Sequence, residues 1–377
     1  MIYKSYKYRL YPTNDQKVLL EKHFGATRFV FNWALESKIK FYKETGKGIS
    51  KFSLNKELTS FKKQEEYNWL YEVNAQSLQE SITNLDSAYT NFFRKQSKFP
   101  KFKSKNNNHQ SFSCPQNNKV NFDKSLLFIP KFKEGIKIKI DRTFIGKIKT
   151  VTISRTPTNK YFASILVETP ENLPVKPELN IEKAVGLDLG LKSFITLSDG
   201  QKFDNPKFIK KSTKKLIRQF RKFSHKKRGS NNKSKQRIKL ARLYEKITNQ
   251  RNDFLQKLST KLIKESQFET FCIENLNISG MVKNHSLAKA ISDSGWATFI
   301  KFLTYKSNWY GKNIIQIGRF EPSSKVCNEC GTINQKLTLS DRTWTCPCGA
   351  ILDRDINAAK NIKDFAFFPQ NLLPKIG

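Results

Sequence analysis

The stretch Ala184-Val185-Gly186-Leu187-Asp188-Leu189-Gly190 places one carboxylate inside an otherwise apolar run. The run is short and aliphatic and ends at a glycine, which predicts a buried β-strand. Aspartate is depleted in strands, and a buried carboxylate is costly unless it is paired or bound to a metal ion. Asp188 is therefore either a turn residue at the strand end or a functional acid.

The segments that follow predict a mixed α/β domain in which two further acidic positions stand where elements meet. A second strand covers 193–197, a third covers 268–273 and ends in Glu274, and a fourth covers 314–317 after a helix over 296–309. The segment 353–362 begins a helix with Asp353 and Asp355. Each acid alone could be a strand-end residue, a loop residue or a helix cap.

Together the three acidic positions favour a shared purpose, because the chain is poor in acids. Two divalent metal ions need several carboxylate oxygens, and such a pair can activate water for attack on a phosphodiester. Strand, strand and helix start are places from which carboxylates could converge, so we expect a metal-dependent nuclease site.

Four of the six cysteines lie close together near the end of the sequence. Cys327 and Cys330 are separated by two residues, and Cys346 and Cys348 follow with one residue between them. This spacing predicts a zinc ribbon with four sulfur ligands and a structural role, whereas four ordinary thiols on two turns are the alternative.

The net charge of the chain indicates what kind of partner it binds. The 377 residues include 69 Lys and Arg against 32 Asp and Glu, a net charge of +37, which indicates a polyanion and above all nucleic acid. Segment 207–242 has 16 Lys and Arg and no Asp or Glu, and segment 99–105 alternates aromatic and basic residues. A solvated helix face is the alternative for the first segment. The candidate phosphate contacts are Lys101, Lys103, Lys105, Lys210, Lys211, Lys214, Lys215, Arg218 and Arg221.

The first 170 residues predict strands interrupted by helices. An alternating strand occupies 1–10, a capping box at Thr13 and Gln16 starts a helix that should end near Gly25, and a second helix follows over 26–44. A helix over 74–94 has one apolar stripe. Short strands follow at 126–129, 136–140, 149–154 and 161–167, and the last two form a hairpin. The first strand is expected to pair with this module, which leaves the helices as an insertion, and 170–177 resembles a linker.

Membrane insertion and secretion are not indicated. No run of 18 apolar residues is present, and the start of the chain has neither an apolar signal core nor a cleavage site. With few cysteines outside the cluster, we expect a cytoplasmic protein in a reducing compartment.

Several motifs, in order along nearly the whole chain, closely resemble the TnpB family, the RNA-guided endonucleases of bacterial and archaeal insertion sequences and relatives of type V CRISPR effectors. These motifs are Tyr6–Thr13, Phe99–Lys105, Gly186–Gly190, Ile273–Leu276, Pro322–Gly331 and Asp353–Ile362. The last two are the most specific, because a zinc ribbon directly before an Asp-x-Asn-Ala-Ala helix is rare elsewhere.

The resemblance implies an α/β multidomain protein. Its parts would be a β-barrel wedge domain (1–12 and 99–180), a helical recognition domain (13–98), an RNase H-like RuvC nuclease domain (181–320 and 351–377) and the inserted zinc ribbon (321–350). It implies catalytic, magnesium-binding roles for Asp188 and Glu274, and for Asp355 in preference to Asp353.

The resemblance also implies the activity: an enzyme that uses a guide RNA from the transposon end and Mg²⁺ to cut double-stranded DNA beside a short transposon-adjacent motif. We expect a monomer with Zn²⁺ in the ribbon.

Gln76 and Gln79 are neighbours at the start of the 74–94 helix. They are candidates for reading the transposon-adjacent motif, because glutamine can bond an adenine edge; ordinary solvated residues are the alternative. A catalytically silent RNA-guided repressor and a strand-transferring transposase are the rival functions, and the retained acids speak against the repressor.

Overall fold

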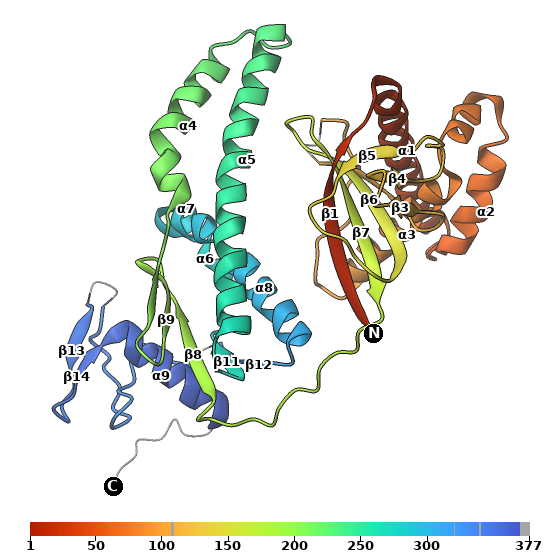
Figure 1. Cartoon of the computed structure of the whole chain (residues 1–377). Helices are drawn as coiled ribbons and strands as arrows, with labels where there is room; N and C mark the ends of the chain where they lie inside the picture. The colour runs from red at the N-terminus through yellow and green to blue at the C-terminus, as the bar shows by residue number, and fades with distance from the viewer. Residues whose placement is uncertain (107–108, 320, 339–340, 370–377) are drawn as a thin grey trace. The chain divides into compact units, whose positions relative to one another are not determined.

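Two compact units make up the chain, Met1–Asn172 and Leu173–Gly377 (Figure 1). The computed structural model describes residues 1–106, 109–319, 321–338 and 341–369, so the last eight residues of the expected nuclease segment lie outside it. No helix in these ranges is long and apolar enough to cross a bilayer.

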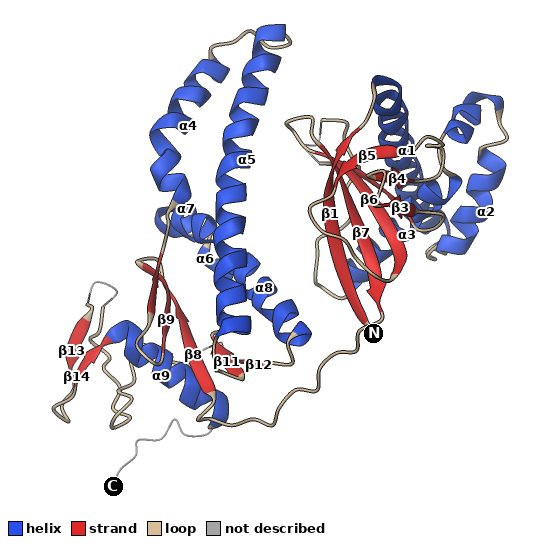
Figure 2. Ribbon diagram, viewed as in Figure 1, coloured by secondary structure: helices blue, strands red, loops and turns tan. Residues whose placement is uncertain are grey.

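The first unit is built on a seven-stranded antiparallel sheet that forms a half-barrel (Figure 2). Its strand order is β2-β6-β7-β1-β5-β4-β3. The first strand pairs with both β5 and β7, as predicted, because its alternating apolar residues Tyr8 and Leu10 enter the sheet core. The strands are β1 (Ile2–Tyr11), β2 (Gln110–Cys114), β3 (Lys119–Asn121), β4 (Leu126–Phe128), β5 (Ile136–Lys139), β6 (Lys147–Arg155) and β7 (Tyr161–Thr169).

Helices fill the connection between β1 and β2. They are α1 (Asn14–Thr45), α2 (Lys51–Phe61), a 3₁₀ helix (Glu65–Glu72) and α3 (Ala75–Phe93). The predicted capping box at Thr13 and Gln16 is confirmed. The predicted break at Gly25 is wrong, because the helix continues to Gly46, a C-cap residue with φ of 68°. Flanking Phe24 and Ala26 are buried, and their packing outweighs the roughly 1 kcal/mol that glycine costs in a helix.

Helix α3 has the predicted apolar stripe. Leu78, Ile82 and Leu85 are buried in a core shared with α1 and α2. Tyr89 packs against the same core, and both Tyr89 and Phe92 form T-shaped ring contacts with Phe99. The stripe is thus structural and leaves the polar face of the helix for other roles.

The second unit is built on a mixed sheet with strand order β10-β9-β8-β11-β12. β8 (Ala184–Leu189), β9 (Ser193–Leu197) and β10 (Lys202–Asp204) pair antiparallel, whereas β11 (Thr270–Ile273) and β12 (Asn313–Gln316) run parallel to β8. Three antiparallel strands followed by two parallel ones give the RNase H-like arrangement of a RuvC domain.

Two helical insertions and a ribbon extend this sheet. α4 (Phe208–Ser224) and α5 (Asn231–Thr260) form a long hairpin between β10 and β11 that projects beyond the sheet (Figure 1). A π-helical turn (Lys261–Glu265) ends α5. Between β11 and β12 lie α6 (Ile278–Met281), α7 (His285–Ser294) and α8 (Trp296–Trp309). The ribbon strands β13 (Thr343–Thr345) and β14 (Ile351–Asp353) pair antiparallel and lead directly into α9 (Arg354–Phe367).

Gly186 allows α9 to lie directly on the central strand. A Cβ atom at this position would lie 1.8 Å from the main-chain oxygen of Ala359, a distance that no side chain could tolerate. The absence of a side chain therefore brings the helix start, with its acids, close to the end of β8.

Candidate active site and zinc ribbon

The first two predicted acids stand side by side on parallel strands. Leu187 of β8 is paired with Ile273 of β11, so Asp188 and Glu274 are the next residues along each strand. Parallel strands in register present such residues on the same side of the sheet. Sheet geometry therefore brings together two carboxylates that lie 86 positions apart in the sequence.

Asp188 is held in surroundings that oppose its negative charge. Burial is the main cause that raises its pKa well above the usual range, and the charges of Glu274 and Asp355 raise it further. The guanidinium groups of Arg354 and Arg342 act in the opposite direction. The charges of Glu274 and Asp355 therefore act on Asp188, which places both carboxylates in its neighbourhood.

Glu274 is half-buried, and among the described residues its carboxylate has the Ser323 hydroxyl as hydrogen-bond partner. Burial raises the pKa of Glu274, and the hydrogen bond from the Ser323 hydroxyl, which lies 2.5 Å from Oε1, lowers it. This bond fixes one carboxylate oxygen and leaves the other for a further ligand. Ser323 lies in the segment that leads into the first cysteine pair.

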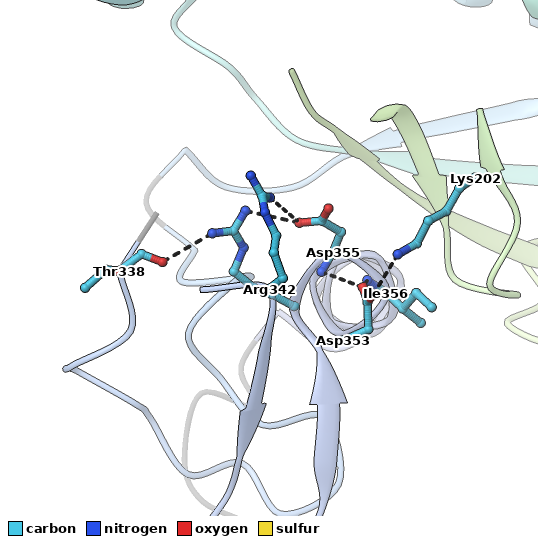
Figure 3. A network of polar contacts seen from close by, with 7 residues as sticks. Lys202, Thr338, Arg342, Asp353, Asp355 and Ile356 are labelled. Atoms are coloured by element: carbon cyan, nitrogen blue, oxygen red, sulfur yellow. Dashed lines mark hydrogen bonds and ion pairs between the residues drawn. The ribbon is translucent and has the colours of Figure 1, made fainter. Parts of the chain in front are cut away.

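Asp353 and Asp355 are held by different groups at the start of α9 (Figure 3). Asp353 is the N-cap: its carboxylate accepts from the main-chain N–H groups of Asp355 and Ile356, and Lys202 Nζ lies 2.7 Å away. Although burial raises the pKa of Asp353, these partners outweigh it and lower the pKa. Asp353 is thus occupied in capping the helix.

Among the described residues, the carboxylate of Asp355 has two arginines as partners. Its Oδ1 lies 3.2 Å from Arg354 and 3.6 Å from Arg342, and its charge acts on Asp188. Among the described residues it is therefore the helix-start acid available to a shared site. The alternative considered from the sequence, with Asp355 as helix cap and Asp353 as loop residue, is wrong, because Asp353 is the N-cap.

The donor set fits divalent metal ions. Asp188, Glu274 and Asp355 offer hard carboxylate oxygens from three elements, and the charges of the last two act on Asp188, so that a cation among them would relieve the repulsion. Asp188, Glu274 and Asp355 are the residues that could hold such ions.

The four predicted cysteines also converge. Their sulfur atoms lie within 4.8 Å of one another, with 3.5 Å between Cys330 and Cys346 and 3.9 Å between Cys327 and Cys348. Four sulfurs bonded to a tetrahedral zinc ion at about 2.3 Å would be separated by about 3.8 Å. The one-residue spacing of the second pair is therefore compatible with a zinc site.

A network of asparagines holds the ribbon against α9. The side chain of Asn357 donates to the main-chain oxygen of Val326 and accepts from the main-chain N–H of Asn328. The Asn328 side chain in turn donates to Asn361 and Asp364. Asn357 and Asn361 are both buried, so this network is part of the structural core of the site.

The basic helix α4 presents its cations to solvent. Lys210, Lys211, Lys214, Lys215, Arg218 and Arg221 are all exposed, and within the described ranges none of them forms an ion pair with an acid. Leu216 packs against α5 on the opposite side. The helix start is fixed from outside, because the buried Asp293 of α7 accepts from the N–H groups of Ile209 and Lys210.

The other predicted contacts lie in the first unit, where Lys101, Lys103 and Lys105 are exposed. Lys103 is also tied to α1, since its ammonium lies 3.8 Å from the centre of the Phe31 ring and its main chain bonds Asn32. The remaining lysines stay candidates for phosphate contact.

Gln76 and Gln79 differ from each other. Gln76 donates to the side chain of Gln116 at 2.8 Å and is half-buried, whereas Gln79 is exposed. Base reading by either residue stays a prediction.

Sequence reasoning missed Ser323, Asp293 and the asparagine network. Ser323 and the asparagines lie inside the two most specific family motifs, so the motifs themselves were a signal, although only their acids and cysteines were given roles. Asp293 has no local signal, because its partners lie 83 and 84 positions away in sequence.

Comparison with known proteins agrees with this architecture. Residues 164–285 match a family model described as "Probable transposase", residues 296–362 match the Cas12f1-like TNB domain, and residues 1–47 match a helix-turn-helix domain. A protein of Streptomyces pristinaespiralis named "Putative RNA-guided DNA endonuclease" is 39% identical, over 95% of this chain and 88% of its own length. The chain belongs to the TnpB family of RNA-guided DNA endonucleases.

Two further similarities extend this result. InsQ of Escherichia coli strain K12, which has the same designation, is 33% identical over 95% of this chain and 91% of its own length. The protein in a solved Cas12f1–sgRNA–target DNA complex shares the fold, with a TM-score of 0.57, 13% identity and coverage of 96% of this chain and 98% of that one.

Proposed function

We propose that this TnpB-family chain is an active endonuclease. Directed by a guide RNA from the transposon end, it cuts double-stranded DNA next to a short transposon-adjacent motif. The observation that supports this most strongly is the convergence of Asp188, Glu274 and Asp355 at one end of the sheet. A catalytically silent repressor would have no use for three neighbouring acids that disfavour the charge of Asp188.

The chain's own residues bind and orient the reacting groups. Asp188, Glu274 and Asp355 hold the metal ions, for which we propose Mg²⁺ because all three donors are carboxylates. Such ions, when bound, make water a better nucleophile and stabilise charge on the phosphate. Ser323 orients Glu274, while Arg342 and Arg354 orient Asp355.

Nucleic acid would be held by the exposed cations. Six lysines and arginines on α4 can bind phosphates of RNA or DNA without regard to sequence. We propose that the half-barrel and the inserted helices of the first unit are the wedge and recognition domains, and that the protein acts as a monomer. A structural zinc ion on the four cysteines would hold the ribbon together.

The deciding experiment is cleavage of a guide-matched duplex by Asp188→Ala. Loss of a carboxylate from a metal site should lower the rate at least a hundredfold. Binding of guide RNA should stay near that of the wild type, because the substitution leaves every exposed cation of α4 in place. Asp199→Ala, which removes an exposed turn acid after β9, is the matched control. Wild-type cleavage by Asp188→Ala would refute the site, and absence of cleavage by the wild-type protein–RNA complex would favour the repressor.

A further inference from the structure

The segment that leads into the ribbon contacts the acid site directly. The Ser323 hydroxyl donates to Glu274 Oε1 at 2.5 Å, and Ser323 is only 4% exposed. A short hydrogen bond from a buried hydroxyl to a half-buried carboxylate restricts the rotamer of that carboxylate. The orientation of Glu274 therefore depends on where the main chain of Ser323 is held.

Helix α9 holds that main chain. The side-chain amide of Asn361 donates to the carbonyl oxygen of Ser323 and to that of Val326, both at 2.7 Å. Asn357 donates to the same Val326 oxygen at 2.6 Å. Residues 323–326 are thus bonded to two buried asparagines of α9, the helix whose first turn contains Asp355.

The first cysteine pair is bonded to the same asparagines. Val326 directly precedes Cys327, and Asn328 follows it. The main-chain N–H of Asn328 donates to Asn357 at 2.9 Å, and its side chain donates to Asn361 at 3.0 Å. An unbroken set of contacts therefore leads from the zinc ligands through the asparagines to Ser323 and Glu274.

We propose that Ser323 is a positioning residue for Glu274, and that the asparagine network makes this positioning depend on the folded, zinc-bound ribbon. The inference rests on the proposed function of the acid site. The ribbon would then set the affinity of the acid site for divalent metal, although none of its cysteines is an acid-site ligand.

The central test compares Ser323→Ala with two variants of the same segment. Ser323→Thr keeps a hydroxyl, and Ser324→Ala changes the adjacent serine, for which the described residues contain no hydrogen-bond partner. Binding of Mn²⁺ to the protein–RNA complex without DNA is measured by electron paramagnetic resonance. Cleavage is measured over a range of Mg²⁺ concentrations.

Ser323→Ala should weaken Mn²⁺ binding about tenfold and raise the Mg²⁺ concentration for half-maximal cleavage by a similar factor, the scale of one hydrogen bond to a charged group. At saturating metal the rate should largely recover. Ser323→Thr should restore metal binding, and Ser324→Ala should match the wild type. Unchanged metal binding in Ser323→Ala would overturn the proposal, as would loss of zinc from that variant, because the hydroxyl would then support the ribbon alone.

The dependence on the ribbon is tested with Asn328→Ala, which leaves Ser323 and all four cysteines in place. It should raise the Mg²⁺ requirement while zinc content stays at one ion per chain, and a wild-type requirement would overturn the link. Asp188→Ala distinguishes failure of the proposed endonuclease function from failure of the positioning role of Ser323. If that variant still cuts DNA, the proposed function fails; if it is inactive while Ser323→Ala behaves as the wild type, only the positioning role fails.

Discussion

The acid site and the basic helix α4 belong to the same unit but are built on opposite principles. Three half-buried carboxylates from β8, the end of β11 and the start of α9 lie near one another, and two of them, Glu274 and Asp355, have specific hydrogen-bond or ion-pair partners. Six cations on α4 are exposed, and no ion pair fixes any of them within the described residues. Cleavage should thus depend on individual carboxylates, whereas nucleic-acid binding should be shared among many charges. A single substitution should therefore have a large effect in the acid site and a small effect on α4.

The largest effect is expected at Gly186, which allows α9 to contact β8. In Gly186→Ala the new methyl group would lie 1.8 Å from the Ala359 oxygen, so the helix must move away from the strand. Overpacking of this kind costs about 1–3 kcal/mol or more and should also separate Asp355 from Asp188. Thermal unfolding and cleavage should both be impaired severely.

Gly48→Ala is the control for this substitution, because a Cβ atom there meets nothing within 4 Å. A wild-type melting temperature and cleavage rate in Gly186→Ala would mean that the close approach of α9 is not required, and the comparison would lose its structural basis.

A second prediction separates the two acids at the start of α9. Asp355→Asn should lower cleavage at least a hundredfold, because the amide cannot replace a charged metal ligand. Asp353→Asn should cleave within a few fold of the wild type, since asparagine is an equally good N-cap. The measurement is the cleavage rate of each variant at saturating Mg²⁺, and the reverse order would make Asp353 the third ligand.

Local patterns predicted many of the strands, the helix α3 and the cysteine cluster, but not the long helix α5 or the short strands β10, β13 and β14. Alternation in 1–10 and the capping box at Thr13 are properties of neighbouring residues, and both are confirmed. The break at Gly25 failed because the helix is stabilised by tertiary packing of Phe24 and Ala26, which no local propensity contains.

The acid site was only partly accessible from sequence. The acidic positions stand out by their residue type and their place at element ends, and the family motif selected Asp355. The division of labour at the start of α9 needed three-dimensional contacts, because it depends on Lys202 and Arg342. Ser323 could not be given a role either, since a serine next to a zinc ribbon acquires one only through its contact with Glu274.

The third prediction tests the distributed character of α4. Replacement of Lys210, Lys211, Lys214 and Lys215 by Gln should weaken nucleic-acid binding about ten- to a hundredfold at moderate salt. It should also lower the slope of log affinity against log salt by up to about one unit per lost phosphate contact. Any one of the four substitutions alone should have a small effect.

The control replaces Lys40 and Lys257 by Gln. These lysines form ion pairs with Glu36 and Asp253 on their own helices, so their replacement should leave the salt slope unchanged. If the quadruple variant shows the slope of the wild type, the α4 face is merely solvated, and the contrast between the two regions disappears.

The smallest effect is expected at the start of α3. A side chain that reads a base there would be exposed, as the α4 cations are, and would have a specific partner, as the acids of the site do. Gln79 is the better candidate of the two glutamines, because Gln76 is half-buried and bonded to Gln116. Gln79→Ala should relax the preference at one position of the transposon-adjacent motif, by a factor that corresponds to about 1–3 kcal/mol, and leave the guide requirement intact. Gln76→Ala should change the preference less, and Thr90→Ala, on an exposed turn of the same helix, should not change it. Cleavage of a library with a randomised motif measures all three variants together. An unchanged preference in Gln79→Ala, or a larger change in Gln76→Ala, would show that exposure on α3 does not decide which residue reads the motif.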